Sequence, residues 1–186
     1  MSTPILGSRH TYTRPEYVDA ETHREISDFL ALESELLDDR RFHDWVELVA
    51  GDFTYQMPTP KTPDTPFKPH FDDRSMLIDE SRWSLALQWF RRFDEDIYEM
   101  AWGENPPVRF RHFITSVRAT RTVDPDAFTV KSNAVLVGTR QSDLPKYITG
   151  ERTDRLERRE GELVLTRRWA VLDQVVIDFP QLRILL

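Results

Sequence analysis

Residues 147–172, YITGERTDRLERREGELVLTRRWAVL, carry the pattern that decides the fold. Two runs, 147–156 and 163–172, are rich in β-branched, aromatic and aliphatic residues, as strands are. Between them lies Glu160-Gly161-Glu162, and a glycine flanked by polar residues is typical of the tight turn that joins antiparallel strands. The stretch therefore predicts a long β-hairpin.

The residues before this hairpin predict further strands. Apolar and charged residues alternate over 108–119, Asp124-Pro125-Asp126 has turn chemistry, and residues 128–137 form another strand-like run. A separate, earlier strand is predicted over residues 53–57 and is expected to stop at Pro58. The second half of the chain should thus form one antiparallel sheet.

The first half predicts helices. Apolar residues recur at helical spacing over 26–37, with Glu33 as the exception, behind a Thr22-x-x-Glu25 pattern typical of a capping box. A shorter helix is expected over 42–49 and a third over 76–93. Helices followed by strands indicate an α+β fold, with helices covering one face of a curved sheet.

One domain should span residues 21–186, preceded by a polar arm over residues 1–20. Five of the 12 prolines lie between residues 58 and 69, which predicts an ordered surface loop there rather than a linker. The apolar tail, residues 179–186, should pack into the core or belong to an interface.

Composition narrows the possible functions of the 186-residue chain. Its net charge of −7 argues against nucleic acid or an anionic membrane as the main partner. The absence of cysteine excludes disulfides, thiol catalysis and cysteine-bound iron–sulfur clusters. No apolar run reaches the ~18 residues of a membrane span, and residues 1–17 do not resemble a secretory signal. We expect a cytoplasmic protein.

Most catalytic signatures are missing from the sequence. The five histidines form neither HxxxH nor HExxH, no GxSxG is present, and the six glycines make no phosphate-binding loop. An acid–base pocket built from Asp44, Tyr55 and His112 is the remaining catalytic hypothesis, because a histidine beside a carboxylate can move protons near neutral pH. The alternative is that Asp44 caps or pairs and that His112 is a satisfied core histidine.

Many arginines occupy the predicted strands at alternating positions, which indicates one charged sheet face. Such a face is either solvated or part of a subunit interface. The arginines concerned are Arg109, Arg111, Arg118, Arg121, Arg152, Arg155, Arg158, Arg159, Arg167 and Arg168.

Four segments, in order, resemble the small (β) subunit of aromatic-ring-hydroxylating dioxygenases. The similar segments are 33–58 with Asp44, Trp45 and Tyr55, 104–117 with Pro106, Pro107, Arg109 and His112, 150–158 with Arg152, and Leu172-Asp173-Gln174 with the tail. The similarity runs from about residue 22 to the end. It is weakest over 71–102, which is several residues longer than the family pattern, and at Val108, where the family often has serine.

The resemblance implies a cystatin-like, NTF2-like cone, in which a strongly bent, mixed but mainly antiparallel sheet carries about three helices on its concave face. It also implies a large α subunit as partner, holding a Rieske [2Fe–2S] cluster and a mononuclear non-haem iron, often in an α3β3 hexamer built on a β trimer. Electrons would come from NADH through a reductase, and O2 would be added to an aromatic compound to give a cis-dihydrodiol.

This chain would then have no catalytic, cofactor-binding or metal-binding residue, because a cysteine-free chain cannot hold a Rieske cluster. Its role would be assembly. The second hypothesis is a stand-alone enzyme of the same fold, a dehydratase or isomerase similar to scytalone dehydratase, which would use Asp44, Tyr55 and His112. A second pocket histidine expected on the next strand is missing from residues 134–140, which weakens that hypothesis.

Overall fold

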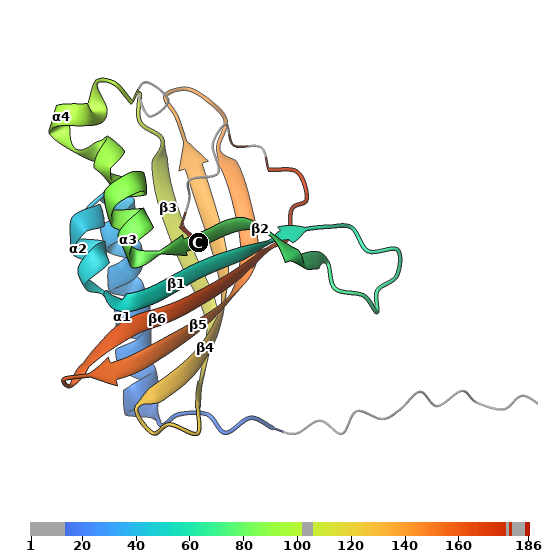
Figure 1. Ribbon diagram of the computed structural model, residues 1–186. Helices are drawn as coiled ribbons and strands as arrows, with labels where there is room; N and C mark the ends of the chain where they lie inside the picture. The colour runs from blue at the N-terminus through green and yellow to red at the C-terminus, as the bar shows by residue number, and fades with distance from the viewer. Residues whose placement is uncertain (1–13, 102–105, 178, 180–184) are drawn as a thin grey trace, which may run out of the picture.

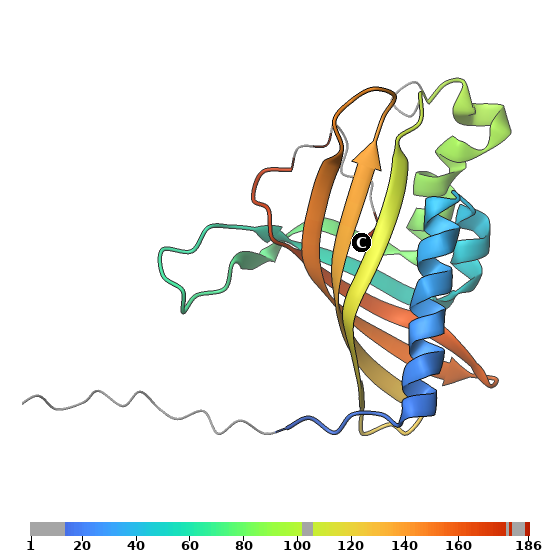
Figure 2. The same ribbon diagram turned by 180° about the vertical axis from the view of Figure 1, so that it is seen from behind.

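The computed structural model describes residues 14–101, 106–177, 179 and 185–186. Six strands form one bent sheet in the order β2-β1-β6-β5-β4-β3. The described helices all lie against one face of this sheet (Figures 1 and 2). The expected α+β arrangement is therefore confirmed.

The sheet is mixed, as expected, because β1 and β6 run parallel while all other neighbours are antiparallel. The hairpin predicted at residues 160–162 is present: Glu160 and Gly161 both have positive φ, 54° and 93°, as a two-residue type I′ turn requires. The strand bounds are β1 Val49–Pro60, β2 Phe71–Ser81, β3 Arg109–Arg121, β4 Ala127–Thr139, β5 Lys146–Arg159 and β6 Glu162–Leu172.

Helix α1, Ala20–Asp38, begins three residues earlier than the predicted capping box. Asp19 is the N-cap and accepts the Thr22 amide hydrogen at 2.9 Å, so the prediction of Thr22 as N-cap is wrong. The Thr22 hydroxyl itself donates to Asp19. α2, Phe42–Glu47, is shorter than predicted because β1 already starts at Val49. None of the described helices is long and apolar enough to cross a membrane.

The third predicted helix, over residues 76–93, is wrong at its start and confirmed as a series of helical turns from residue 82 onward. Residues 71–81 form β2, which pairs with β1 through Met57 and Ile78. Helical turns start only at Arg82, in the order α3 Arg82–Ser84, π-helical η1 Leu85–Trp89, 3-10 η2 Phe90–Phe93 and α4 Glu95–Tyr98. The short apolar run Met76–Ile78 is compatible with both a helix and a strand, and its pairing with β1 makes it a strand.

The proline-rich segment is a hairpin arm rather than a simple loop. β1 continues through Pro58 to Pro60, with register shifts on both sides of Pro58, so the predicted stop at Pro58 is wrong. Residues 61–70 then project away from the body of the molecule (Figure 1). The Lys61 amide donates to the His70 carbonyl at 2.8 Å and closes the base, while Phe67 near the tip is 94% exposed.

Strand β3 forms one edge of the sheet, and α1 lies alongside it (Figure 2). The register of its pairing with β4 shifts between Thr115 and Arg118, where Ser116 has φ 54°. Groups from α1 and from the segments flanking it bind the free main-chain groups of β3. These bonds join Asp38 to the His112 amide, His23 to the Val117 carbonyl and the Val18 amide to the Ala119 carbonyl. Arg40 donates in the same way to the carbonyl of Val108, the residue before β3.

Most of the predicted arm, residues 1–13, lies outside the described residues. Its end is held against the sheet, because Tyr17 bridges Thr120 and the Val18 side chain is buried. The tail contributes to the core through Leu185 and Leu186, which are both buried. Phe179 also packs inside, with its ring close to Phe110.

Gly150 is a position where the packing excludes any side chain. A Cβ atom there would collide with the main chain of Val171 on β6, which cannot move without breaking the sheet. We expect Gly150→Ala to lower the free energy of unfolding by about 1–3 kcal/mol. Gly51→Ala is the matched control, since a Cβ at Gly51 meets nothing within 4 Å. Equal midpoints of urea unfolding for the two variants would contradict this packing argument.

Candidate functional site

The inside of the sheet holds a buried network of four charged side chains. Glu33 comes from α1, Arg152 and Asp154 from neighbouring inward positions of β5, and Arg168 from β6. Each is at most 1% exposed. Alternation along β5 turns residues 152 and 154 to the same face, and the pairing of Asp154 with Arg168 brings β6 into the network.

Glu33 and Asp154 each contact both arginines. Arg152 Nη2 donates to Glu33 Oε2 at 2.9 Å and to Asp154 Oδ2 at 2.6 Å. Arg168 donates to the same two carboxylates, at 2.8 Å to Glu33 Oε2 and 2.9 Å to Asp154 Oδ1. The indole Nε1 of Trp45 adds a bond to Glu33 Oε1 at 3.2 Å. Two positive and two negative charges therefore balance within one network.

The electrostatics keep this network ionised. Burial alone would raise the pKa of Glu33, but the adjacent Arg168 and Arg152 outweigh it and lower the pKa to about 2. Burial opposes the charge of Arg168, and Asp154 and Glu33 more than compensate, so its pKa is raised. Glu33 is thus held as a carboxylate, and its bonds to the arginines leave it unsuited to accept a proton from a substrate.

His112 lies next to this interior and is bound on both sides. Its Nδ1 is 2.6 Å from Asp38 Oδ1 and its Nε2 is 2.8 Å from the Leu185 carbonyl oxygen. Tyr55 is buried nearby on β1, its hydroxyl accepts the Leu186 amide hydrogen at 3.2 Å, and burial raises its pKa to about 12. Leu185 and Leu186 therefore occupy the space in which Tyr55 and His112 would meet a substrate.

Asp44 does not join Tyr55 and His112, contrary to the catalytic hypothesis. Its side chain is 55% exposed on α2 and pairs with Arg41 at 2.7 Å. The carboxylate beside His112 is Asp38, which the sequence analysis did not select. Trp45, next to Asp44, points inward instead, is fully buried, and packs edge-on against Phe53 and Phe90.

The other predicted family positions lie at the start of β3 and at the end of β6. Pro106 and Pro107 are half-buried and lead into β3, at whose start Arg109 is exposed. The Asp173 amide donates to the Thr149 carbonyl, and Gln174 Oε1 accepts the Thr149 amide hydrogen at 3.1 Å. Asp173 and Gln174 thereby fasten the end of β6 to β5.

The arginines do not share one sheet face, so that prediction is wrong. Arg152 and Arg168 are on the inner face and fully buried, whereas Arg155, Arg159 and Arg167 alternate with them toward the outside. Arg158 also turns inward and binds Glu25 of α1 through two bonds of 2.7 Å. The two arginines were predicted on a charged face because their contacts with Glu33 and Asp154 depend on the position of α1 and on the register of β5 with β6.

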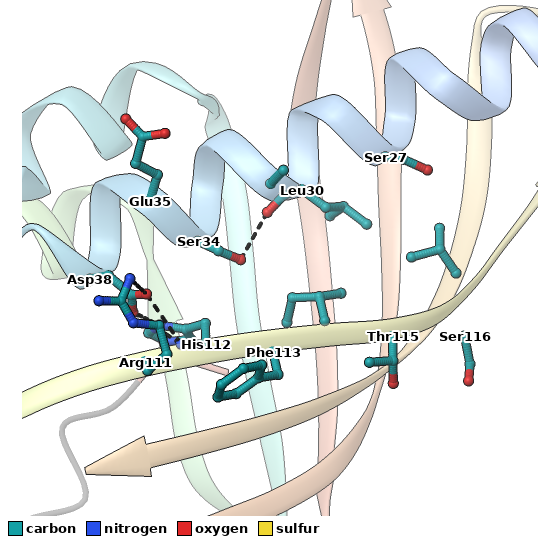
Figure 3. A pocket seen from close by; sticks show the side chains of 13 residues that line it. Ser27, Leu30, Ser34, Glu35, Asp38, Arg111, His112, Phe113, Thr115 and Ser116 are labelled. Atoms are coloured by element: carbon teal, nitrogen blue, oxygen red, sulfur yellow. Dashed lines mark hydrogen bonds and ion pairs between the residues drawn. The ribbon is translucent and has the colours of Figure 1, made fainter. Parts of the chain in front are cut away.

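A groove of about 660 Å³ runs between α1 and the edge strand β3 (Figure 3). Leu30, Ala31 and Ile114 contribute apolar walls, and Asp38, Arg111 and His112 lie at one end. Arg111 Nη1 is 3.1 Å from Asp38 Oδ2, so this end of the groove is also ion-paired. Among the residues that the structure describes, no group of three or more histidines or carboxylates is placed to hold a metal ion.

A family model described as "Ring hydroxylating beta subunit" matches residues 32–179. The chain belongs to this family. A curated relative of this beta subunit is the 3-phenylpropionate/cinnamic acid dioxygenase subunit beta of Photorhabdus laumondii. It is 35% identical over 173 residues, which cover 90% of this chain and 93% of the relative.

Solved structures agree on the fold of the beta subunit. A chain of naphthalene 1,2-dioxygenase superposes with a TM-score of 0.77 at 23% identity, covering 91% of this chain and 88% of that one. The beta subunit of benzoate 1,2-dioxygenase from Burkholderia mallei gives 0.61 at 20% identity, covering 85% and 93%. The expected NTF2-like cone is therefore confirmed, and the protein is the beta subunit of an aromatic-ring-hydroxylating dioxygenase.

Proposed function

We propose that this beta subunit is a non-catalytic assembly component, which supports the large subunits of the dioxygenase without touching the substrate. The observation that carries the proposal is the filled interior of the sheet. The Glu33–Arg152–Asp154–Arg168 network is balanced and buried, and both ring nitrogens of His112 are engaged. A general acid or base needs a proton-carrying atom within reach of substrate, and these groups offer none.

The redox centres of the enzyme do not fit this chain. A Rieske cluster needs two cysteines and two histidines, and the sequence has no cysteine. A non-haem iron needs a facial set of two histidines and a carboxylate, and no such cluster occurs within the described part of the chain. Both centres are therefore assigned to a large α subunit, which receives electrons from NADH through a reductase and adds O2 to an aromatic compound to form a cis-dihydrodiol.

The proposed assembly is a cytoplasmic α3β3 hexamer with a trimer of this chain at its base. Co-expression with a Rieske-type large subunit, followed by size-exclusion chromatography with light scattering, tests it. We expect the chain to be colourless alone and to co-elute with the Rieske absorbance at the mass of three copies of each subunit. A chain that stays in a small homo-oligomer beside the large subunit would overturn the assembly role.

His112→Ala separates the assembly role from the acid–base hypothesis. Because His112 ties Asp38 to Leu185, its loss should reduce the yield of assembled complex, while turnover per assembled complex stays within about twofold of wild type. A general acid–base residue would instead cost about 10²–10⁴-fold in turnover with normal assembly. Quantifying complex by light scattering and product by chromatography distinguishes the two results.

A further inference from the structure

The contacts of His112 fix its protonation state. Asp38 Oδ1 lies 2.6 Å from Nδ1, and the carbonyl oxygen of Leu185 lies 2.8 Å from Nε2. A carbonyl oxygen can only accept a hydrogen bond, so Nε2 must carry a hydrogen. Nδ1 must carry one too if Asp38 is ionised.

Asp38 is bound as a carboxylate. Besides the ring, it accepts the His112 amide hydrogen at 3.1 Å, and the guanidinium of Arg111 lies 3.1 Å from its second oxygen. These two donors engage both oxygens, and because an imidazole is more basic than a carboxylate, the hydrogen between Oδ1 and Nδ1 belongs to the ring. The side chains of Asp38 and His112 are only 4% and 5% exposed, so water does not substitute for either partner.

We propose that His112, held as the doubly protonated imidazolium, is a proton-dependent latch that fastens Leu185 and Leu186 inside the sheet. If Nε2 lost its proton, its lone pair would face the Leu185 carbonyl oxygen. If Nδ1 lost its proton, its lone pair would face the Asp38 carboxylate. Both arrangements are repulsive. Docking of Leu185 and Leu186 therefore takes up a proton. Raising the pH should weaken docking, because the undocked ring gives the proton back to water.

The charged and titratable surroundings among the described residues do not replace this proton. Asp38 and Glu35 come from α1, Arg111 adjoins His112 on β3, and Tyr55 of β1 lies on the far side of Leu186. Glu35 lines the same groove, on the turn of α1 before Asp38 (Figure 3). Asp38 is thus the group that obliges the ring to be charged.

Hydrogen exchange of the Leu186 amide measures docking, since this amide donates to the buried Tyr55 hydroxyl. In the full-length chain, we expect its protection factor to fall from about pH 5.5 to 8.5, approaching about tenfold for each pH unit once the undocked ring is neutral. Nitrogen-15 spectra of the ring should show both nitrogens protonated while Leu186 is protected. A protected Leu186 beside a neutral ring would overturn the latch, and so would protection that does not depend on pH.

Asp38→Asn is the decisive variant. An asparagine amide can donate to Nδ1 of a neutral ring while Nε2–H still binds Leu185, so docking should persist with its pH dependence flattened. Glu35→Gln is the matched control, on the same helix and in the same groove, and should keep the wild-type slope. An Asp38→Asn chain with the wild-type slope would overturn the proposal. If that variant does not fold, the nitrogen-15 spectrum of the wild-type ring remains the test.

Discussion

Replacing Arg168 by methionine is expected to lower the free energy of unfolding by about 3–5 kcal/mol. Arg168 is fully buried and binds both Glu33 and Asp154. Its removal leaves two carboxylates facing a single remaining guanidinium, that of Arg152, inside the sheet. The cost is that of an uncompensated buried charge rather than of lost packing volume, because methionine fills much of the same space.

Urea unfolding of the isolated chain or its complex measures this effect. Arg167→Met is the matched control, since Arg167 precedes Arg168 on β6, is exposed and donates to the Gln56 side chain at 3.3 Å. The control should change the free energy of unfolding by less than about 0.5 kcal/mol. If the two variants were equally stable, the buried network would not contribute as its geometry indicates.

Acid should remove a second large contribution, of about 3 kcal/mol, through Glu33. The pKa of Glu33 is lowered from 4.5 to about 2 in the folded chain, since the arginines outweigh its burial. A depressed folded pKa gives stability that is complete above the unfolded pKa. This stability is lost as the pH falls from about 4.5 toward 2, where the folded protein must also accept the proton.

Unfolding free energies measured from about pH 6 down to about pH 2.5 test this contribution. Glu33→Gln should be less stable than wild type at pH 6 and should lose the steepest part of the acid dependence. Glu25→Gln is the control, because the pKa of Glu25 is also lowered by Arg158, but its side chain is 41% exposed and the pair is screened. Matching acid slopes in wild type and Glu33→Gln would refute the assignment.

The strands β3 to β6 could be predicted because each is long and alternates, and because their turns carry glycine, aspartate and proline. Residues 76–81 could not, since their apolar residues fit a helical period while the partner that makes them a strand, β1, is distant in sequence. The start of α1 was misplaced because Thr22 and Asp19 are both good caps. Only the observed bond from the Thr22 amide to Asp19 decides between them.

The candidate site was predictable only in part. The sequence analysis selected Tyr55, His112 and Arg152, and noticed that Glu33 interrupts an apolar stripe. That interruption was the available signal for the buried network, because a carboxylate on a buried face needs a cation. Its partners on β5 and β6 could not be identified without the register of the sheet. The pairing of His112 with Asp38 rather than Asp44 depends on the position of α1 along β3, which no local pattern encodes.

The capped edge of β3 limits how copies of this chain can associate. A bare edge strand is a template on which another strand, and then another sheet, can grow without end. Here the bonds from Val18, His23 and Asp38 already occupy main-chain groups of β3, and the prolines and register shifts of β1 distort its pairing with β2 at the other edge. Open-ended growth of the sheet through strand addition is thereby disfavoured at both edges.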